Sequence, residues 1–177
     1  SETLSQCYLS SVPKKHKTTI QTLINQINLL VDKNKTVGYI PWISKHWAPD
    51  DDDNIKKDER VYFTAENAKR IDMYRHLINQ VPNKHLRPFL LGPLLVECSI
   101  HNNTNGQFSA YYKGEDKIGK YGGKNSVDVN RITKKIELKM PVLIENKCKC
   151  VVSKLDTNVW VQRLPKLDLV YYDPPYN

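Results

Sequence analysis

The sequence predicts an α/β protein, on the basis of two contrasting patterns of apolar residues. Residues 14–31 carry apolar side chains three or four positions apart, which is the spacing of an amphipathic helix. Residues 169–172 are a short aliphatic and aromatic run, which is typical of a buried strand. Pro174 and Pro175 end that run, because proline lacks the N–H that a strand ladder needs. Open α/β sheets bind ligands at the carboxyl ends of their strands, so this turn is a candidate site.

Helical patterns dominate the first half of the chain. Thr64 is a good N-cap, and apolar residues at helical spacing continue from it to about Gln80. A mostly apolar helix is predicted for residues 87–100, and such a helix is expected to be buried. Pro93 falls inside it and should kink or split it, because proline removes a hydrogen bond of the helix. A shorter, partly apolar element is predicted for residues 1–11.

Two further segments are strand-like, which completes the α/β pattern. They are residues 135–143 and residues 149–153, and Pro141 confines the first to a sheet edge or to a strand end. Asp156 follows them and precedes a short helical or irregular segment, which ends at Pro165 before the last strand.

Composition limits the kinds of partner. The 177 residues are 40% hydrophobic, which is enough for a core, and the net charge of +8 favours a polyanionic partner. No run of about 18 apolar residues exists, so no membrane span is expected. The four cysteines match no zinc pattern, which indicates reduced thiols in a cytosolic protein. Consecutive aspartates at residues 50–53 lack the spacing of a calcium loop and are interpreted as a solvated loop, so no metal site is predicted.

Residues 113–135 form a basic, glycine-bearing segment. It holds seven basic and three acidic residues, with glycine at four positions. A mobile loop of this composition suits contact with phosphates, although a plain solvated loop accounts for the charge equally well. The candidate nucleic-acid contacts are Lys113, Lys117, Lys120, Lys124 and Arg131.

The turn after the last predicted strand carries Asp173, Pro174, Pro175 and Tyr176. This motif resembles the catalytic motif of amino-directed DNA methyltransferases, which use S-adenosyl-L-methionine. Blocks upstream resemble the Dam-like, alpha-class adenine methyltransferases and come in the order of that family. Together the blocks cover most of residues 60–177, which makes the resemblance far more specific than the motif alone. The blocks are residues 62–75, 103–113, 138–143 and the segment that runs from Asp156 into the motif.

The resemblance implies part of a Rossmann-like, S-adenosyl-L-methionine-dependent methyltransferase fold with a largely helical inserted DNA-recognition region. Residues 1–35 would be a helical part of the methyltransferase core, and residues 36–135 the target-recognition and DNA-binding region. Residues 136–177 would return to the catalytic core strands. The resemblance also implies an adenine-N6 methyltransferase of a restriction-modification system, acting on double-stranded DNA in the bacterial cytoplasm, at the nucleoid.

The catalytic residues implied by the resemblance are those of the motif. The Asp173 carboxylate and the Pro174 carbonyl would accept hydrogen bonds from the amino group that is methylated, and Pro175 completes the rigid turn. Tyr176 would stack on the target base, which must leave the duplex to be reached.

The cofactor-binding residues implied by the resemblance are Asp156, Asp173 and Glu2. Asp156 matches the acidic position that contacts the adenine amino group of the cofactor, and Glu2 matches the acid that bonds the ribose hydroxyls. The family's Phe-x-Gly-x-Gly turn, which lets the backbone approach the methionine part of the cofactor, does not occur in this sequence. The chain is therefore expected to be an interior fragment that needs the remainder of the enzyme or a complementing subunit.

Other functions stay open at this point. One is a non-catalytic DNA-binding piece or split subunit, whose partner supplies the glycine turn. The motif serves exocyclic amines generally, so cytosine competes with adenine as the target more closely than RNA or protein glutamine does. The sequence does not give the recognition site, because that depends on which side chains reach base edges.

Overall fold

The computed structural model describes residues 2–10, 14–106, 108–143 and 150–171, and these are largely helical. Within these ranges no strand forms, and β-structure is limited to two isolated antiparallel bridges, Thr104 with Tyr111 and Lys113 with Gly119. None of the helices described is both long enough and apolar enough to cross a lipid bilayer. The helices are α1 (Glu2–Leu9), α2 (Lys14–Asp32), α3 (Ile43–His46), α4 (Ala65–Gln80), η1 (Lys84–Leu86), α5 (Pro88–Ile100), η2 (Lys124–Ser126), α6 (Val129–Thr133) and α7 (Thr157–Val161).

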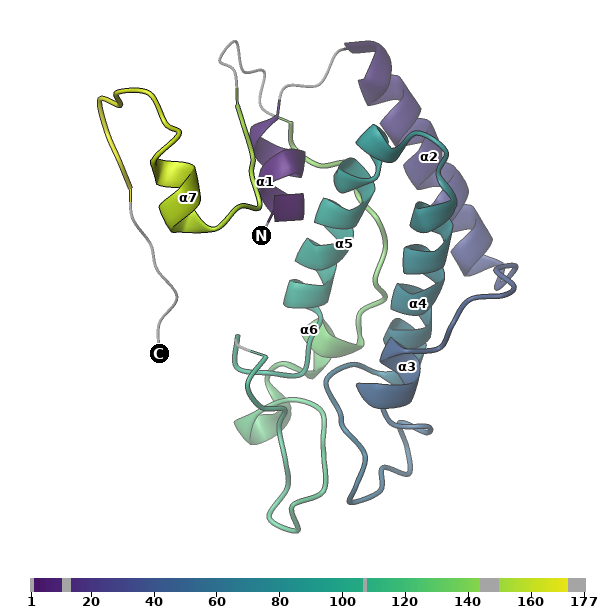
Figure 1. Ribbon diagram of the computed structural model, residues 1–177. Helices are drawn as coiled ribbons and strands as arrows, with labels where there is room; N and C mark the ends of the chain where they lie inside the picture. Colours follow the sequence, from purple (N-terminus) through teal and green to yellow (C-terminus); the bar gives the residue numbers. More distant parts are fainter. Residues whose placement is uncertain (1, 11–13, 107, 144–149, 172–177) are drawn as a thin grey trace.

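Helices α2, α4 and α5 lie side by side and enclose the core (Figure 1). Helix α1 packs on the other side of α5, and the short α3 packs against α4. The core consists of buried, mostly aliphatic side chains of these helices, with Tyr74 and Phe89 among them. Ile136 and Leu138, which follow α6, are buried in the same core. The core therefore joins residues from all three segments distinguished in the sequence.

Three helices predicted from the spacing of apolar residues are confirmed, with nearly the expected bounds. Thr64 is the N-cap of α4, and its hydroxyl accepts a hydrogen bond from the Asn67 backbone N–H at 3.1 Å. Of the two predicted effects of Pro93, a kink or a split, the split is wrong, because α5 continues through this residue. A proline inside a helix costs about 3 kcal/mol, whereas each fully buried Leu or Phe contributes about 1.5 to 3 kcal/mol. Several such side chains of α5 are buried around Pro93, which favours the continuous helix.

The predicted strand at residues 135–143 is not a strand. Its side chains do alternate as in a strand, with Ile136 and Leu138 buried and Glu137 exposed. Its backbone, however, bonds to side chains of the helices. The Asn28 amide in α2 donates to the Leu138 carbonyl at 2.9 Å and accepts from the Leu138 N–H at 3.1 Å.

Asn67 in α4 bonds the same segment a few residues earlier. Its amide nitrogen donates to the carbonyls of Ile132 at 3.2 Å and Lys134 at 2.9 Å, and its oxygen accepts from the Ile136 N–H at 2.9 Å. Arg70 adds a hydrogen bond from Nε to the Ile136 carbonyl at 2.7 Å. These side chains satisfy buried backbone groups that a neighbouring strand would otherwise bond. The segment therefore needs no sheet.

The other two predicted strands are also not formed where the structure describes them, at residues 150–153 and 169–171. Leu169 and Tyr171 are 87% and 85% exposed, so the expected burial is absent too. A strand persists only beside a partner whose backbone it bonds, and none is formed within the described ranges. The sheet of the predicted α/β fold is therefore missing from this part of the chain.

The basic segment at residues 113–135 is more firmly attached than the predicted mobile loop. Buried Asn103 donates from its amide to the Lys120 carbonyl at 2.8 Å and accepts from the Gly122 N–H at 3.1 Å. The segment also contains η2 and α6, and Ile132 of α6 is fully buried. These long-range bonds hold the segment in place, and the charge and glycine content of the segment did not indicate them.

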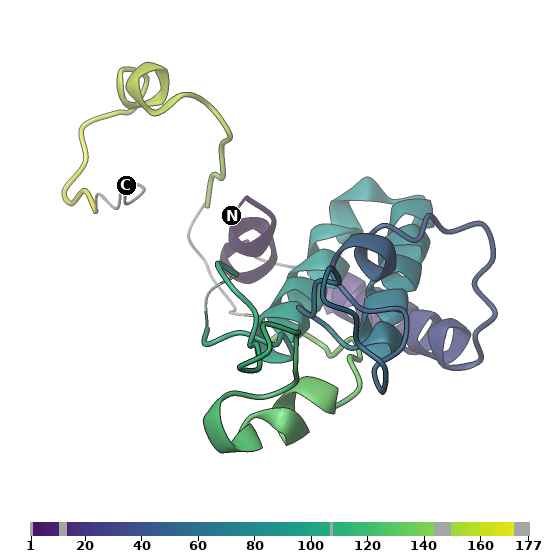
Figure 2. The same cartoon turned by 90° about the horizontal axis from the view of Figure 1, so that it is seen from below.

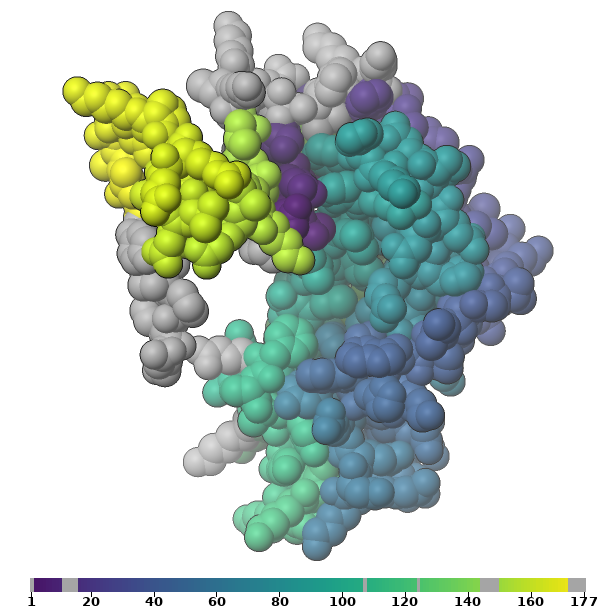
Figure 3. Space-filling view, viewed as in Figure 1, coloured from purple at the N-terminus to yellow at the C-terminus, as the bar shows by residue number. Residues whose placement is uncertain are grey.

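Residues 150–171, called here the C-terminal arm, stand away from the helical core and contain α7 (Figures 1 and 2). The arm meets the core beside α1 (Figure 3). Ser5 and Leu9 of α1 line the groove between the two parts.

Candidate functional site

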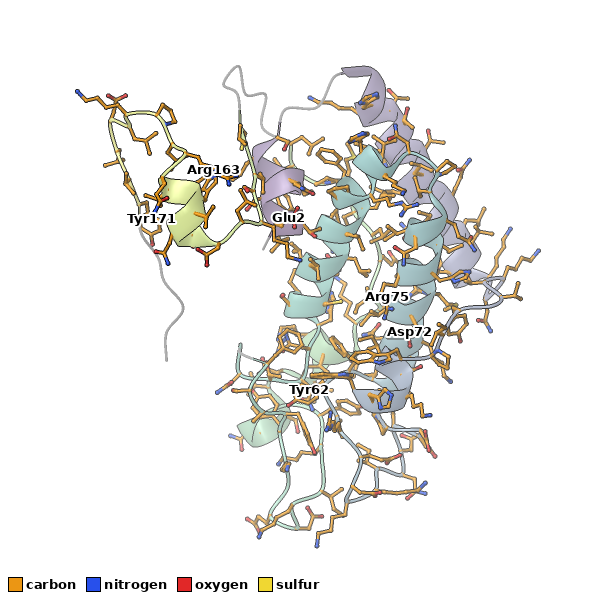
Figure 4. All side chains as sticks on the ribbon, in the orientation of Figure 1. Glu2, Tyr62, Asp72, Arg75, Arg163 and Tyr171 are labelled. Atoms are coloured by element: carbon orange, nitrogen blue, oxygen red, sulfur yellow. The ribbon has the colours of Figure 1, made fainter. Side chains whose placement is uncertain are left out.

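The motif expected to carry catalysis lies outside the described residues. Asp173, Pro174, Pro175 and Tyr176 all follow residue 171, and so does the cofactor contact expected of Asp173. The structure describes the C-terminal arm that leads to them. Tyr171 lies on that arm, apart from the helical core (Figure 4).

The C-terminal arm and α1 border an open groove of about 590 Å³. Its lining is mainly apolar and includes Trp160 and Leu164 of the arm. Leu155 and Thr157, the two neighbours of Asp156 in the chain, line it as well. The predicted cofactor residue Asp156 therefore lies at the border of an apolar groove.

Asp156 is the N-cap of α7. Its Oδ1 accepts hydrogen bonds from the backbone N–H groups of Asn158 at 3.0 Å and Val159 at 3.3 Å. This cap explains why an aspartate stands there without any ligand. A carboxylate has a second oxygen, which leaves the expected cofactor contact chemically possible.

Glu2, the other predicted cofactor residue in the described part, lies in the first turn of α1 and is exposed (Figure 4). Its Oε1 accepts a hydrogen bond from Gln6 Nε2 at 3.1 Å, one helical turn later. Glu2 thus begins a helix, whereas the resemblance places the acid after a strand.

The predicted phosphate contacts Lys113, Lys117 and Lys120 are exposed. Lys113 Nζ lies 4.9 Å from the centre of the Tyr111 ring, which is a cation–π contact. Lys117 occupies a turn with φ of 64°, and Lys124 opens η2, although its side chain lies outside the described part.

Arg131, the fifth predicted contact, bonds the backbone of the protein itself. Its guanidinium donates to the carbonyls of Ile100, of Asn102 at 2.9 Å and of Thr104 at 3.3 Å. It also pairs with Asp128 at 3.5 Å. These contacts fasten the turn that follows α5.

An ion cluster around buried Glu97, missed in the sequence, joins α5 to the segment after α6. Lys139 Nζ lies 2.7 Å from Glu97 Oε1, and His101 Nε2 lies 3.2 Å from Glu97 Oε2. His101 Nδ1 meets the Arg131 carbonyl, so both ring nitrogens have a polar partner. The four-residue spacing of Glu97 and His101 on an apolar helix is the one sign of this cluster in the sequence.

The aspartates at residues 50–53 are exposed except for Asp52, so the solvated-loop interpretation holds for three of them. Asp52 accepts from the Ala65 N–H at 2.9 Å, at the start of α4, and from the Tyr121 hydroxyl. Burial and this carboxylate raise the pKa of Tyr121. Among the described residues, no group of three His, Cys, Asp or Glu side chains is placed to hold a metal ion.

Five aromatic side chains that the sequence did not connect form one contiguous surface, called here the aromatic band. The ring centres of Trp42 and Trp47 are 6.4 Å apart, and those of Trp47 and Tyr62 are 4.8 Å apart. Tyr62 in turn lies 5.0 Å from Tyr111 and 6.3 Å from Phe108. The sign in the sequence is weak, because the rings come from two aromatic segments far apart in the chain.

The sequence is similar to type II methyltransferases. It is 31% identical over 124 residues to the type II methyltransferase M.FokI of Planomicrobium okeanokoites. It is 29% identical over 124 residues to the modification methylase StsI of Streptococcus sanguinis, and 29% identical over 121 residues to the type II methyltransferase M.CviAII of Paramecium bursaria Chlorella virus 1. No protein-family model and no solved structure matches the chain.

Each of these matches covers 67% of this chain. The chain spans 17% of the length of the first two relatives and 32% of the third. The similarity supports the expected relationship to methyltransferases in its broad form. The names of the relatives carry neither a target base nor the Dam-like class, so these finer features stay predictions.

Proposed function

We propose that this chain is part of a site-specific DNA methyltransferase of the Dam-like, alpha class, which methylates the N6 amino group of adenine in double-stranded DNA. The observation that carries the proposal is the 31% identity to a type II methyltransferase over 67% of the chain. The motif from Asp173 to Tyr176 adds groups suited to an exocyclic amine. The relative named a modification methylase supports a role in a restriction-modification system.

The proposal divides the chain as the resemblance does. Residues 36–135 are the target-recognition region, and the helical content of this region and the net charge of +8 of the whole chain support that role. Residues 1–35 belong to the methyltransferase core. Residues 136–177 return to the methyltransferase core, where residues 150–153 and 169–171 contribute strands to a Rossmann-like sheet once neighbouring strands lie beside the C-terminal arm.

The chemistry follows from the groups of the motif. The adenine amino nitrogen is a weak nucleophile, because its lone pair is delocalised into the ring. Hydrogen bonds from this NH₂ group to the Asp173 carboxylate and the Pro174 carbonyl favour the rehybridised nitrogen and position it for in-line attack. Tyr176 holds the extruded base by stacking. Bound S-adenosyl-L-methionine supplies an electrophilic methyl group on a sulfonium.

The described residues fit one half of that cofactor. The apolar groove lined by Leu155 and Thr157, the chain neighbours of Asp156, suits an adenine ring. Glu2 lies on α1, which also borders this groove. The chain holds no Phe-x-Gly-x-Gly turn for the methionine half, so the proposal requires that turn from the rest of the enzyme or from a complementing subunit.

The substitution Asp173→Ala tests the catalytic assignment. In the complete enzyme, we expect transfer of a radiolabelled methyl group to adenine in DNA to fall at least about 100-fold, because one of two acceptors for the amino group is lost. Asp168→Ala is the matched control, since Asp168 is an exposed carboxylate of the same arm, and it should retain activity. Full turnover by Asp173→Ala would refute the assignment. Methyl transfer to cytosine and not to adenine by the unchanged complete enzyme would refute the adenine specificity.

A non-catalytic DNA-binding piece or split subunit is the second candidate. The exposure of Leu169, Val170 and Tyr171, at 87%, 67% and 85%, favours it, because a partner would cover such an apolar run. Calorimetric titration of the chain alone with S-adenosyl-L-methionine separates the two candidates. Heat of binding supports a cofactor site within this chain, and its absence supports a fragment or split subunit that needs the glycine turn from elsewhere.

A further inference from the structure

The aromatic band exposes flat rings that proteins normally bury. Trp42 is 46% exposed and Phe108 is 45% exposed, one at each end of the band. Trp47, Tyr62 and Tyr111 between them are half-buried. Exposed aromatic side chains that touch one another mark an interaction surface, since they offer a large contact area with few rotatable bonds.

Backbone hydrogen bonds fix the middle of the band from behind. The Tyr62 N–H donates to the Trp47 carbonyl at 3.0 Å, and the Asn103 N–H donates to the Tyr62 carbonyl at 2.8 Å. The Tyr111 hydroxyl donates to the Glu59 carbonyl at 3.2 Å. The two segments that carry the rings are therefore bonded to one another.

Helix α4 fixes the Trp42 end of the band. Buried Asp72 of α4 accepts hydrogen bonds from the N–H groups of Ile43 and Ser44, both at 2.9 Å. Asp72 thereby caps α3, which begins directly after Trp42 (Figure 4). A surface fixed in advance loses little conformational entropy when a ligand binds to it.

Cations flank the band at both ends. Lys113 Nζ lies 4.9 Å from the centre of the Tyr111 ring, and the Arg60 guanidinium lies 5.9 Å from the centre of the Trp47 ring. Positive side chains beside stacked flat rings are the combination with which proteins hold the bases and phosphates of unpaired nucleic acid.

The two ends differ in their acidic neighbours. The groove beside Arg60 is lined also by the acidic side chains of Asp50, Asp58 and Glu59. Hydrogen bonds from the backbone N–H groups of Lys56 and Asp50 hold the pKa of Glu59 below its usual range, so its negative charge stays. The Arg60 end is therefore unsuited to a phosphate, which leaves Lys113 as the cation of the band that can meet one.

We propose that the aromatic band binds an unpaired base of DNA by stacking, with Lys113 at the adjacent phosphate. The inference rests on the proposed function, because extrusion of the target base from a duplex leaves its partner base unpaired. The base in the band is thus a different one from the base expected at Tyr176. The band stabilises the opened duplex while chemistry occurs elsewhere.

Aromatic grooves also bind proline-rich peptides, which are the main rival ligand. The cation–π contacts of Lys113 and Arg60 favour DNA, since a neutral peptide gains nothing from them. The basic net charge of +8 favours DNA for the same reason.

Three fluorescein-labelled duplexes test the proposal by anisotropy. One is fully paired, one has a single bulged thymidine, and one has an abasic nucleotide at the bulge. We expect the intact chain to bind the bulged thymidine about 5- to 100-fold more tightly than the abasic bulge, which is the effect of stacking one base. The abasic duplex has the same flexibility, so any difference reports the base itself.

Variants locate the effect on the band. Trp42→Ala and Phe108→Ala should each reduce the preference for the bulged base severalfold and leave binding to the paired duplex unchanged. Trp160→Ala is the control, because Trp160 belongs to α7 in the C-terminal arm. Lys113→Gln should weaken binding to all three duplexes and lower the salt dependence by about one phosphate contact. Circular dichroism verifies that each variant keeps its helices.

Equal affinity for the bulged thymidine and the abasic bulge would overturn the proposal. An unchanged preference for the bulged thymidine in both Trp42→Ala and Phe108→Ala would overturn it as well. Tighter binding to a proline-rich peptide than to the bulged duplex would assign the band to a protein partner. The outcome is separable from that of the proposed function. If the complete enzyme prefers the bulged base but transfers no methyl group, base binding by the aromatic band is supported and the methyltransferase function is refuted. If it transfers methyl groups without this preference, the function is supported and base binding by the band is refuted.

Discussion

At the scale of single residues, Asn28 and Asn67 bond a segment that alternates like a strand. Each side-chain amide donates to a backbone carbonyl of this segment and accepts from a backbone N–H. Asn67 is 1% exposed, so water does not replace these bonds if the amide is removed. Buried Asn67 and half-buried Asn28 therefore attach residues 134–138 to α4 and α2.

Asn67→Ala is expected to destabilise the fold by about 2 to 4 kcal/mol, because it leaves two buried backbone groups and one partly buried group without a partner. Denaturant unfolding monitored by circular dichroism measures the change. Asn79→Ala, on an exposed position of the same helix, is the control and should be neutral or slightly stabilising. Equal stability of Asn67→Ala and the parent chain would show that water or a shift of the segment satisfies those groups.

At the scale of elements, α1 and α5 approach one another closely at Gly92. A Cβ atom at this position would lie 2.7 Å from Cβ and Sγ of Cys7, which is closer than real contacts allow. Cys7 is fully buried at this contact, and burial raises the pKa of its thiol to about 11. The packing of α1 thus depends on the missing side chain.

Gly92→Ala tests this contact, and two effects oppose one another. Alanine favours the helix by up to about 1 kcal/mol over glycine, while overpacking costs about 1 to 3 kcal/mol. We expect the overpacking to exceed the helix gain, so the variant should unfold at a lower temperature. Cys7 should also react faster with a thiol reagent, as followed by mass spectrometry, because α1 is displaced.

Ser99→Ala is the control for the element, since Ser99 is an exposed position of α5. It should raise helix stability slightly and leave the reactivity of Cys7 unchanged. A higher melting temperature for Gly92→Ala would mean that α1 is free to shift without loss.

The elements also explain which parts of the fold the sequence predicts. Helices α2, α4 and α5 follow from local spacing and from the Thr64 cap, because their hydrogen bonds close within four residues. The alternation at residues 135–143 predicts burial correctly but not the bonding partner. The Asn28 amide lies 110 positions from Leu138, and no local pattern announces such a bond.

The candidate site likewise has a local part, which the sequence shows, and a part assembled from distant segments, which it does not. The motif from Asp173 to Tyr176 is contiguous, so it is visible in the sequence although it lies beyond the described residues. The aromatic band is assembled from two segments, and its connection appears only when Tyr62 meets Phe108 and Tyr111.

At the scale of the whole molecule, the helical core and the C-terminal arm contribute unequally to the free energy of unfolding. The buried residues of the core run from Cys7 to Leu138, and the arm adds none. Deleting residues 150–177 is therefore expected to change the free energy of unfolding by no more than about 1 kcal/mol. It should also reduce aggregation, because the apolar side chains of the arm are exposed.

A longer deletion from residue 134 is the contrast. It also removes Ile136 and Leu138, which are 0% and 2% exposed, and should cost at least about 4 kcal/mol. Differential scanning calorimetry of both truncated chains makes the comparison. A large loss of stability from the shorter deletion would mean that the arm belongs to the core.

The position of the core within the chain has a consequence for synthesis. Ribosomes make the chain from its amino end, and a domain generally folds as a unit as it emerges. All buried core residues in the described part of the chain, and all five rings of the aromatic band, precede residue 139. The surface proposed to bind DNA is therefore made before the motif expected to carry the chemistry.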